Sequence, residues 1–403
     1  MKRSLRVLKY GGSSLATAEH IDRVARQIID QKRDGEDIVV VASAMGGTTD
    51  DLLSLAGSLN DDPPARELDK LLCTGEYVST ALLCMALQRH GHDAVSLSGA
   101  QCGIQTSGDH FRAAVEHIDT RRMRHELSEG RIVVAAGFQG RGPDHEITTL
   151  GLGGSDITAV VLAAALGAGR CEICSDVDGV YSADPRVVEQ ASRIDEISYA
   201  EMLEMARHGA SVLNPRAVEH AQRHQVEIYS RSTERPEAGG TLIHDLEPAA
   251  PRIVGIASHD ELLPLVIEHH QHHAGEAADE MLAGLDEDDL FVDHVDADTG
   301  RRDILIPAER LPDAAAFGRE LEKRYDERIV AGPACSSVSA IGLGVGDADE
   351  LRRTSRRYSE QAGVELRSDF MAEHAITCVV EPEHASTLMN VFHREFDCPA
   401  EAA

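Results

Sequence analysis

Apolar residues in the first 245 positions alternate between short continuous runs and helical stripes. Leu5 to Tyr10 and Asp37 to Ala44 are runs of the kind expected for strands buried on both faces. Between them, apolar residues recur on one face of a predicted helix, namely Ile21, Val24, Ala25, Ile28 and Ile29. Further strands are predicted at Arg131–Ala136, Glu172–Ser175 and Val226–Ser230, and further helices at Ala65–Ala86, Asp156–Leu166, Tyr199–Arg207 and Val218–His224. This alternation predicts an α/β domain, with a mostly parallel sheet sandwiched by helices.

The strand and helix pattern changes after a polar, proline-bearing stretch at Glu247–Pro251. Beyond it, short strands and helices are predicted twice over, from about Leu262 to Glu327 and from Ser336 to Phe396. We therefore divide the chain of 403 residues into a catalytic domain, 1–246, and two small α+β modules, 247–330 and 331–403. A tandem pair of such modules suits a regulatory region.

Charge narrows the possible partners. The chain has 69 acidic and 39 basic residues, a formal net charge of −30, which repels nucleic acid and anionic membranes. The same charge repels ATP at long range, so any phosphate site must be a local arrangement of backbone N–H groups and a few cations. The N-terminus has no apolar segment of a secretory signal, and no apolar run approaches the roughly 20 residues of a membrane helix. A cytoplasmic protein is predicted, with no nucleic-acid or membrane partner.

No dedicated metal site is predicted. Of eight cysteines, only Cys171 and Cys174 form a C-x-x-C pair, and residues three apart on a strand point to opposite faces. Reduced, buried thiols are therefore favoured over a redox or metal pair. The histidines at 269, 270, 272 and 273 are interpreted as a solvated turn rather than as ligands.

Glycine- and hydroxyl-rich loops follow several predicted strands. They are KYGGSS (Lys9–Ser14), SAMGGTTD (Ser43–Asp50), GFQG (Gly137–Gly140) and TTLGLGGSD (Thr148–Asp156). Ligands of open α/β sheets bind at the carboxyl ends of strands, where glycine lets the backbone approach a phosphate. The sequence contains no G-x-x-x-x-G-K-[ST], so it is not a P-loop enzyme.

Together with CTGEYVS, CEICSDVDGVYSADPR, GASVLNPRAV and GGTLI, these loops resemble the aspartate kinases of the amino-acid kinase superfamily, in the same order, over residues 5–245. The resemblance implies an amino-acid kinase fold followed by two ferredoxin-like ACT modules, which pair with a second subunit as a homodimer. It implies transfer of the γ-phosphoryl group of ATP, with Mg²⁺, to the side-chain carboxylate of L-aspartate. The product, 4-phospho-L-aspartate, leads to lysine, threonine and methionine, so a small-molecule amino acid is the expected partner.

The resemblance also implies roles for residues on the nucleotide side. Lys9 matches the lysine that steadies the transferring phosphoryl group, and Asp156 matches the aspartate that organises this lysine and the phosphate site. Asp156 could equally cap the helix that it begins. Further residues match the ATP-binding positions, namely Gly11, Gly12, Ser13, Ser175, Asp176, Tyr181, Arg186 and Ser211.

On the acceptor side, Glu76 matches the glutamate that holds the substrate amino group, although it could be a surface helix charge. The hydroxyl residues Ser43, Thr48 and Ser155 match positions near the acceptor carboxylates, and each also suits an ordinary turn. Leu152 completes the predicted acceptor site.

Two positions depart from the family pattern. Leu152 stands where G-R-G-G-S-D has an arginine that grips the α-carboxylate, and Ser211 stands where G-A-K-V-L has a lysine that contacts phosphate. Arg231 and Arg141 are the candidates that could replace the missing arginine. Asn214 stands where histidine is common, a milder change.

The tail loops depart further. His269–Ala278 and Gly344–Leu351 lack the D-x-P-G and H-P-G patterns of the effector loops, which predicts weakened feedback control. Two other functions stay open. The chain could be a divergent amino-acid kinase that acts on another carboxylate, as Leu152 favours, or a non-catalytic regulatory paralogue, which intact Lys9, Glu76 and Asp156 disfavour.

Overall fold

The computed structural model describes residues 4–32, 35–246, 252–267, 291–295, 301–311, 313–324, 329–342 and 348–398. These residues form two compact units. Unit 1 contains residues up to Val180, Arg193–Leu203 and Ser211–Glu247, and unit 2 contains Tyr181–Ser192, Glu204–Ala210 and the residues from Pro248 on. The predicted boundary stretch, the His269–Ala278 loop and residues 343–347 lie outside the described residues.

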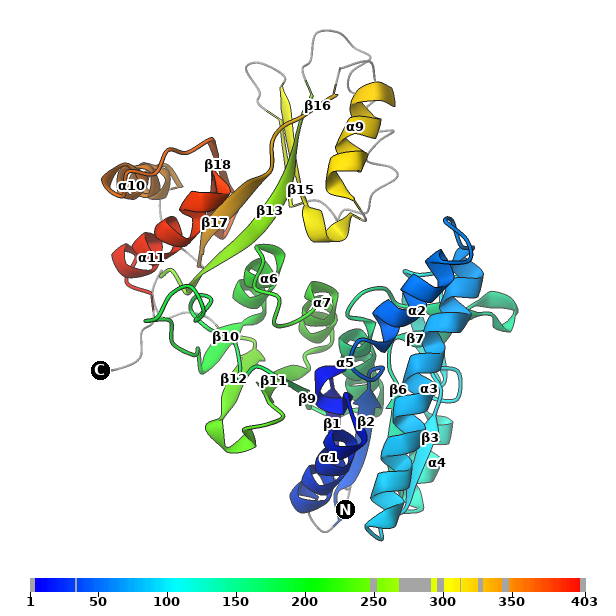
Figure 1. Ribbon diagram of the computed structural model, residues 1–403. Coiled ribbons are helices and arrows are strands. Elements are labelled where there is room, and N and C mark those ends of the chain that lie inside the picture. The colour runs from blue at the N-terminus through cyan, green and yellow to red at the C-terminus, as the bar shows by residue number, and fades with distance from the viewer. Residues whose placement is uncertain are drawn as a thin grey trace. The chain divides into compact units, whose positions relative to one another are not determined.

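Unit 1 is built on an eight-stranded sheet (Figure 1). In sheet order its strands are β10 (Glu196–Ser198), β12 (Gly240–His244), β11 (Glu227–Ser232), β9 (Arg170–Ser175), β1 (Leu5–Tyr10), β2 (Asp37–Ala42), β6 (Ile132–Ala136) and β3 (Ala94–Leu97). All neighbouring strands are parallel except β11 and β12. The chain leaves β1 toward β2 and later returns to its other side as β9, so the strand order reverses at β1.

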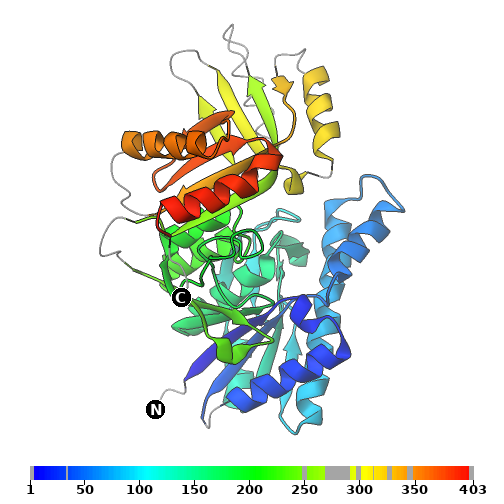
Figure 2. The same cartoon turned by 60° about the vertical axis from the view of Figure 1, so that its left-hand side comes forward.

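Helices cover both faces of this sheet. The helices α1 (Ala18–Gln31) and α3 (Ala65–Arg89) lie side by side on one face in both views (Figures 1 and 2). Leu8 and Tyr10 of β1 belong to the core cluster that these helices form with the strands. The helix α5 (Gly154–Leu166) packs on β1, β2 and β9. Because strand residues alternate between faces, Lys9 points to the face opposite that of Leu8 and Tyr10.

The remaining elements of unit 1 surround this core. A four-stranded sheet has the order β5 (Val115–Ile118), β4 (Ile104–Thr106), β7 (Gln139–Arg141) and β8 (Ile147–Thr149). The other helices are η1 (Ser13–Leu15), α2 (Thr48–Gly57), α4 (Arg121–Ser128), η2 (Pro143–His145), α7 (Pro215–His224) and η3 (Pro236–Ala238). The helix α6 (Tyr199–Arg207) has its first five residues in unit 1 and the rest in unit 2.

Unit 2 contains a seven-stranded antiparallel sheet. Its strands are β14 (Val292–Val295), β15 (Arg302–Pro307), β13 (Gly255–Ile267), β17 (Cys335–Ile341), β19 (Ala375–Val380), β18 (Ser368–Met371) and β16 (Ile329–Ala331), which pairs with β13. Its helices are η5 (Ala308–Arg310), α9 (Ala314–Arg324), α10 (Ala348–Gln361), η6 (Pro382–His384) and α11 (Ala385–Glu395). Figure 2 shows α10 and α11 beside each other.

The units differ from the predicted three-part division in two respects. Tyr181–Ser192 and Glu204–Ala210 group with unit 2. Val188 of the first segment joins the core that contains Ile256 and Phe392, and His208 of the second forms a hydrogen bond with the Ser339 hydroxyl. The two predicted modules also share one sheet, since the first part of β13 pairs with β17 and its last part with β15 and β16. A pattern of local elements could not reveal a strand that serves two modules.

Candidate functional site

Three of the predicted loops leave the carboxyl edge of the eight-stranded sheet, after β1, β2 and β6. The strands β1, β2, β6 and β9 are adjacent and parallel, so the segments that follow them leave from the same edge. The loop after β1 lies where the strand order reverses. Open α/β sheets bind their ligands at such a reversal. The topology therefore brings together loops from four distant parts of the sequence.

Lys9 and Asp156 form an ion pair at this edge. The Lys9 ammonium lies 2.6 Å from Oδ1 of Asp156, and both side chains are about nine-tenths buried. Lys9 comes from β1 and Asp156 from the first turn of α5, where the helix dipole also favours a negative charge. The pair places one fixed cation and one fixed anion where the predicted phosphoryl transfer requires them.

The glycine loop after β1 offers backbone donors beside Lys9. Gly12 and Ser13 begin the 3₁₀ helix η1, where N–H groups have no partner within the helix. Gly12 is required sterically, because a Cβ there would lie 3.0 Å from the carbonyl oxygens of Ala44 and Gly46. The expectation for Gly11 needs correction, since its N–H donates to the Cys174 carbonyl over 3.2 Å and so ties β1 to β9 instead of facing a phosphate.

Glu76 is a buried carboxylate with one oxygen in use. It is 3% exposed, and its Oε1 accepts from the backbone N–H of Ala44, 3.1 Å away in the loop after β2. Its Oε2 is buried without a hydrogen-bond partner among the described residues. Burial raises the pKa of Glu76 to about 7. A buried carboxylate with an unsatisfied oxygen is suited to bind an ammonium group, so the alternative of a surface helix charge is wrong.

Hydroxyl groups from the loop after β2 and from the first turn of α5 also meet. The Oγ atoms of Ser43 and Ser155 are 2.8 Å apart, and Gly137 permits this approach because a Cβ there would lie 2.7 Å from the Ser155 Cβ. Thr48 lies at the start of α2, and its hydroxyl donates to the Met45 carbonyl over 2.5 Å. The Thr48 hydroxyl therefore donates within its own turn, and it can only accept a hydrogen bond from a ligand.

The acceptor loop, residues 150–154, is held from α7. Leu152 is 77% exposed, and its carbonyl accepts from Nδ2 of Asn214 over 2.8 Å. Oδ1 of Asn214 also caps α7, and Arg216 donates to the Leu150 carbonyl over 2.8 Å. Gly153 has a φ of 70°, and a Cβ there would lie 2.3 Å from the Asn214 amide nitrogen, so only glycine fits. Asn214 and Arg216 therefore fix the backbone at the position of the missing arginine.

We expect Asn214→Ser to loosen this loop while leaving the fold intact. Serine is also a good helix cap, so the melting temperature should change little, whereas the donor to Leu152 is lost. One hydrogen bond of about 1 kcal/mol corresponds to a roughly fivefold rise in the KM of the acceptor. Steady-state kinetics with each substrate varied in turn would measure it. An equal rise in the KM of ATP would contradict a role confined to the acceptor loop.

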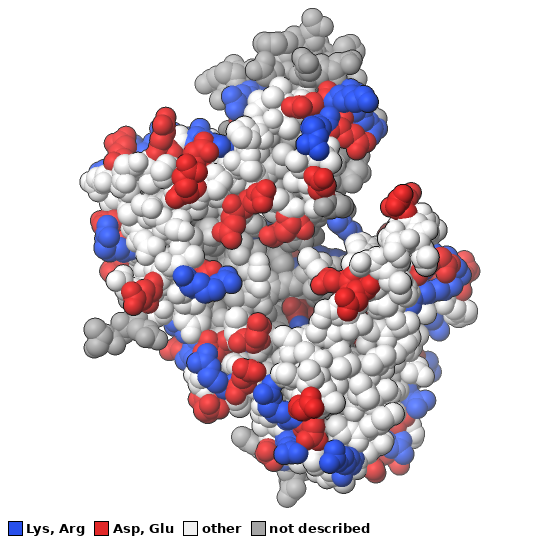
Figure 3. Space-filling model, in the orientation of Figure 1, with Lys and Arg blue, Asp and Glu red and all other residues white. Residues whose placement is uncertain are grey.

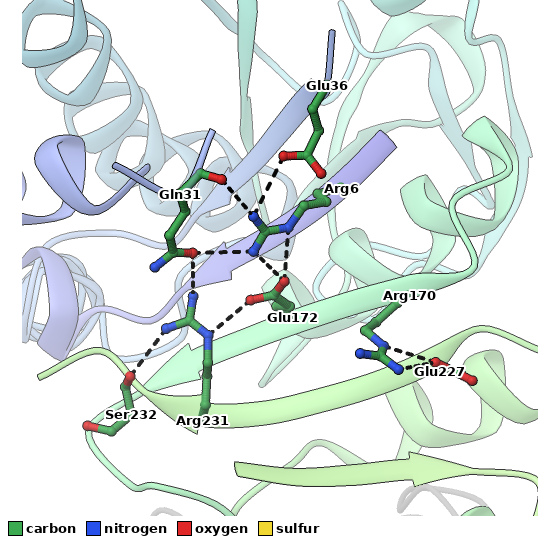
Figure 4. Close-up of polar contacts among 8 residues, drawn as sticks. All are labelled: Arg6, Gln31, Glu36, Arg170, Glu172, Glu227, Arg231 and Ser232. Atoms are coloured by element: carbon green, nitrogen blue, oxygen red, sulfur yellow. Dashed lines mark hydrogen bonds and ion pairs between the residues drawn. The ribbon is translucent and has the colours of Figure 1, made fainter. Parts of the chain in front are cut away.

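Arg231 does not replace the missing arginine. Its side chain is 4% exposed, and its guanidinium bonds Glu172 at 3.0 Å and Gln31 at 3.2 Å (Figure 4). Arg6 binds the same Glu172 carboxylate from β1, so the network joins β1, β9 and β11. Arg231 is committed to holding strands together, and that prediction was wrong. Arg141 ends β7, and its proposed role stays a prediction.

The predicted nucleotide residues divide between the units. Ser175 ends β9, and Asp176 follows it with an exposed side chain. Tyr181 lies in unit 2, and so does Arg186, whose exposed guanidinium pairs with Asp184 at 2.7 Å. Ser211 is exposed at the start of the segment that leads to Asn214. Unit 1 therefore contains Ser175, Asp176 and Ser211, and the ATP-binding roles of all five residues stay predictions.

The sequence patterns missed two residues beside this site. Phe138, after β6, has a φ of 70°, which is uncommon for a bulky residue and concentrates at functional sites. Asp69 of α3 is fully buried, and its carboxylate binds the Thr149 hydroxyl at 2.6 Å, the His110 ring and the Phe111 N–H. Asp69 thereby anchors β8 just before the acceptor loop. An aspartate within a helical pattern carries no local signal of such contacts.

Comparisons with known proteins identify the family and the fold of the chain. The model of the Amino acid kinase family matches residues 4–230. The chain is 40% identical to an aspartokinase of Geobacillus stearothermophilus, over 98% of both chains, and 38% identical to an aspartokinase of Mycobacterium bovis, over 98% of this chain and 96% of that one. The structure of E. coli aspartokinase III in complex with aspartate and ADP has the same fold, with a TM-score of 0.82 at 23% identity, over 98% of this chain and all of that one.

These findings confirm the predicted fold class, an amino-acid kinase fold followed by a strand-rich region consistent with ACT modules. The buried Lys9–Asp156 pair and the half-satisfied Glu76 lie within the matched residues. On this evidence the chain belongs to the aspartokinase family.

Proposed function

We propose that the protein transfers the γ-phosphoryl group of ATP to the side-chain carboxylate of L-aspartate, giving 4-phospho-L-aspartate and ADP. The observation that carries the proposal is the carboxyl edge of unit 1, where a buried lysine–aspartate pair from β1 and α5 accompanies a buried carboxylate of α3 with a free oxygen. Its relatives at 38–40% identity are named aspartokinases.

In the proposed reaction, an oxygen of the acceptor carboxylate forms a bond to the γ-phosphorus, and the bond from that phosphorus to the β,γ-bridging oxygen breaks. Negative charge spreads over the equatorial phosphoryl oxygens in the transition state. The Lys9 ammonium offsets this charge, and Asp156 keeps the ammonium in place. The N–H groups of Gly12 and Ser13 stabilise phosphate oxygens without adding charge.

Glu76 binds the acceptor in this proposal. Its free Oε2 accepts from the α-ammonium group of aspartate, while its Oε1 stays on Ala44. Ser43 and Ser155 hydroxyls lie at the same edge and can bond a carboxylate. In this proposal, Phe138 and the acceptor loop that Asn214 holds form the remaining side of the aspartate-binding site. Binding through the ammonium explains how the site selects an amino acid even without the family arginine.

Mg²⁺ is proposed to arrive with ATP. No group of three or more His, Cys, Asp or Glu side chains that could hold a metal occurs among the described residues. The exposed Asp176, which follows β9, offers carboxylate oxygens, the kind of ligand that Mg²⁺ prefers. When bound, the ion would neutralise charge on the β- and γ-phosphates.

One assay separates the proposed activity from its alternatives. The protein is incubated with ATP, Mg²⁺ and a panel of amino acids, the acyl phosphate is trapped with hydroxylamine, and ADP is measured. Hydroxamate that depends on aspartate supports the proposal. Hydroxamate with a different acid would identify a divergent kinase, and background ADP with every acid would identify a regulatory paralogue.

Leu152→Arg is expected to lower the KM of aspartate. The exposed leucine occupies the family position of the arginine that grips the α-carboxylate, and a charge-assisted hydrogen bond contributes roughly 1.5–3 kcal/mol, a ten- to hundredfold change. Leu152→Met, which adds no charge, is the control and should leave the KM unchanged. If Leu152→Arg leaves the KM of aspartate untouched, the account of this loop is wrong.

Other parts of the function are also proposals. We propose a cytoplasmic enzyme at the entry to lysine, threonine and methionine synthesis, with a homodimer formed through the ACT modules. Weakened feedback control rests on two loops that lie largely outside the described residues. Inhibition by micromolar lysine or threonine would contradict it.

A further inference from the structure

The guanidinium of Arg216 lies against the acceptor loop. Arg216 is the second residue of α7, and its Nη1 donates to the Leu150 carbonyl over 2.8 Å. A Cβ on Gly151 would lie 3.7 Å from the same nitrogen. Leu152 is the next residue along the loop, and Ser155 follows in the first turn of α5. Arg216 therefore brings a positive charge to the segment that leads into the proposed acceptor site.

Arg216 forms no ion pair with any residue that the structure describes. Other cations of unit 1 are committed, as Arg231 is to Glu172 and Lys9 to Asp156. Figure 3 likewise shows blue and red side chains next to each other at several places on the face in view. Acidic residues outnumber basic ones by 69 to 39, yet the charge of Arg216 is left to a ligand. A partly buried cation without a partner favours the binding of an anion.

The hydrogen bond to the loop leaves one edge of the Arg216 guanidinium free. The Leu150 carbonyl uses Nη1 only, and Nε and Nη2 donate to no described residue. Neither atom is among the buried atoms that lack a partner, so both are accessible to a ligand. Nε and Nη2 form an edge that binds a carboxylate through two parallel N–H···O bonds. Because the bond to Leu150 already orients the side chain, little of its freedom is lost when an anion binds.

We propose that Arg216 binds the α-carboxylate of the acceptor amino acid, in place of the arginine that Leu152 replaces in the family pattern. This inference rests on the proposed function, in which Glu76 binds the α-ammonium group. Glu76 and Arg216 then recognise the two charged groups that α-amino acids share, and the side-chain carboxylate is left for the phosphoryl group. Arg216 is thereby a specificity-determining residue, since an acceptor without an α-carboxylate gains nothing from it.

Two other arginines fit this role less well. Arg112 also reaches Gly151, but through its aliphatic Cγ, 3.6 Å from a Cβ built there, and Arg112 already takes part in another interaction. Arg141 belongs to the four-stranded sheet, whereas Arg216 contacts the loop itself. The simpler role for Arg216 is to anchor the loop through Leu150, and an experiment must separate anchoring from binding of the carboxylate.

The first test compares two acceptors in the hydroxamate assay, L-aspartate and its α-amide, which keeps the ammonium and the side-chain carboxylate. Arg216→Met should raise the KM of aspartate roughly ten- to hundredfold more than that of the amide, because only aspartate offers the charged group. If the amide is not phosphorylated, its inhibition constant against aspartate gives the same comparison. Arg223→Met removes the same charge from the exposed last turn of α7 and should change neither value. Equal rises for both acceptors would show that Arg216 only anchors the loop, and would overturn the proposal.

The second test returns the charge to the family position. In the double variant Leu152→Arg/Arg216→Met, the new arginine should bring the KM of aspartate at least tenfold below that of Arg216→Met alone. Arg216→Lys keeps the charge but not the planar fork, so it should raise this KM by less than Arg216→Met does. An unchanged KM of aspartate in Arg216→Met would overturn the role of Arg216 and leave the kinase proposal standing. A wild-type protein that forms no hydroxamate with aspartate would instead overturn the proposed function.

Discussion

Replacing Lys9 with methionine is expected to lower kcat by about a thousandfold, the loss typical of a preorganised charge that stabilises a transition state. Methionine keeps the length of the side chain but removes the ammonium that lies 2.6 Å from Asp156. The variant should still bind ATP, since the N–H donors of Gly12 and Ser13 remain. The hydroxamate assay under saturating aspartate and ATP measures the effect.

Loss of stability must be separated from loss of catalysis in this variant. Removing one partner of a largely buried ion pair leaves an unpaired charge, which costs about 3–5 kcal/mol of unfolding free energy. The double variant Lys9→Met/Asp156→Asn removes both charges, so it should recover stability in a denaturant titration while staying inactive. A single Lys9→Met variant that keeps kcat within tenfold of the wild type would exclude Lys9 from the chemistry.

Glu76→Gln should raise the KM of aspartate by roughly a hundredfold, the value of a charge-assisted hydrogen bond in a buried site, and leave the KM of ATP unchanged. Glutamine has the same shape but cannot supply the negative oxygen that an ammonium requires. Glu76→Asp, which keeps the charge but shortens the reach, is the matched control and should recover part of the binding. A similar KM for wild type and Glu76→Gln would show that the ammonium binds elsewhere.

The pH dependence gives an independent readout of the same residue. Burial raises the pKa of Glu76 to about 7, so below this pH the carboxyl is protonated and cannot bind the ammonium. The wild-type kcat/KM for aspartate should therefore rise about tenfold from pH 6 to pH 8, and this rise should be absent in Glu76→Gln. A flat wild-type profile would refute the assignment.

Stability should follow the opposite trend. The folded state holds the Glu76 proton up to a higher pH than the unfolded state does, so this residue makes the protein less stable as pH rises from about 4.5 to 7. Glu76→Gln avoids the buried charge and should be more stable than the wild type at pH 8, by roughly 3 kcal/mol for a pKa raised from 4.5 to about 7. The buried charge at the acceptor site therefore lowers the free energy of unfolding, and a denaturant titration can measure this difference.

Local patterns predicted several elements of unit 1 closely, although β3, β10, β12, the four-stranded sheet, α2 and α4 were not predicted. β1 and α6 have the predicted bounds, and α3 ends at Arg89, three residues after its predicted end. These elements depend on periodicity and propensity within one segment, which the sequence displays directly. The lysine–aspartate pair was also predicted, because the family motifs carry both residues.

Longer-range contacts could not be predicted in the same way. The bond from Asn214 to Leu152 joins residues 62 positions apart, and the ion pair from Arg231 to Glu172 joins residues 59 apart. Gly11 was expected to face phosphate, but β9 lies beside β1 and its Cys174 carbonyl takes the N–H. Each of these contacts follows from the strand order, and many strand orders are compatible with the same local pattern.

The amino-acid sequence by itself determined the fold class, the glycine loops and the residues that carry charge at the site. Tertiary structure alone decided which of them work together. It buried Glu76 with one free oxygen and placed Tyr181 and Arg186 in unit 2. The physical reason is that burial and partner choice depend on which segments pack together, whereas secondary structure depends largely on the spacing of side chains within one segment.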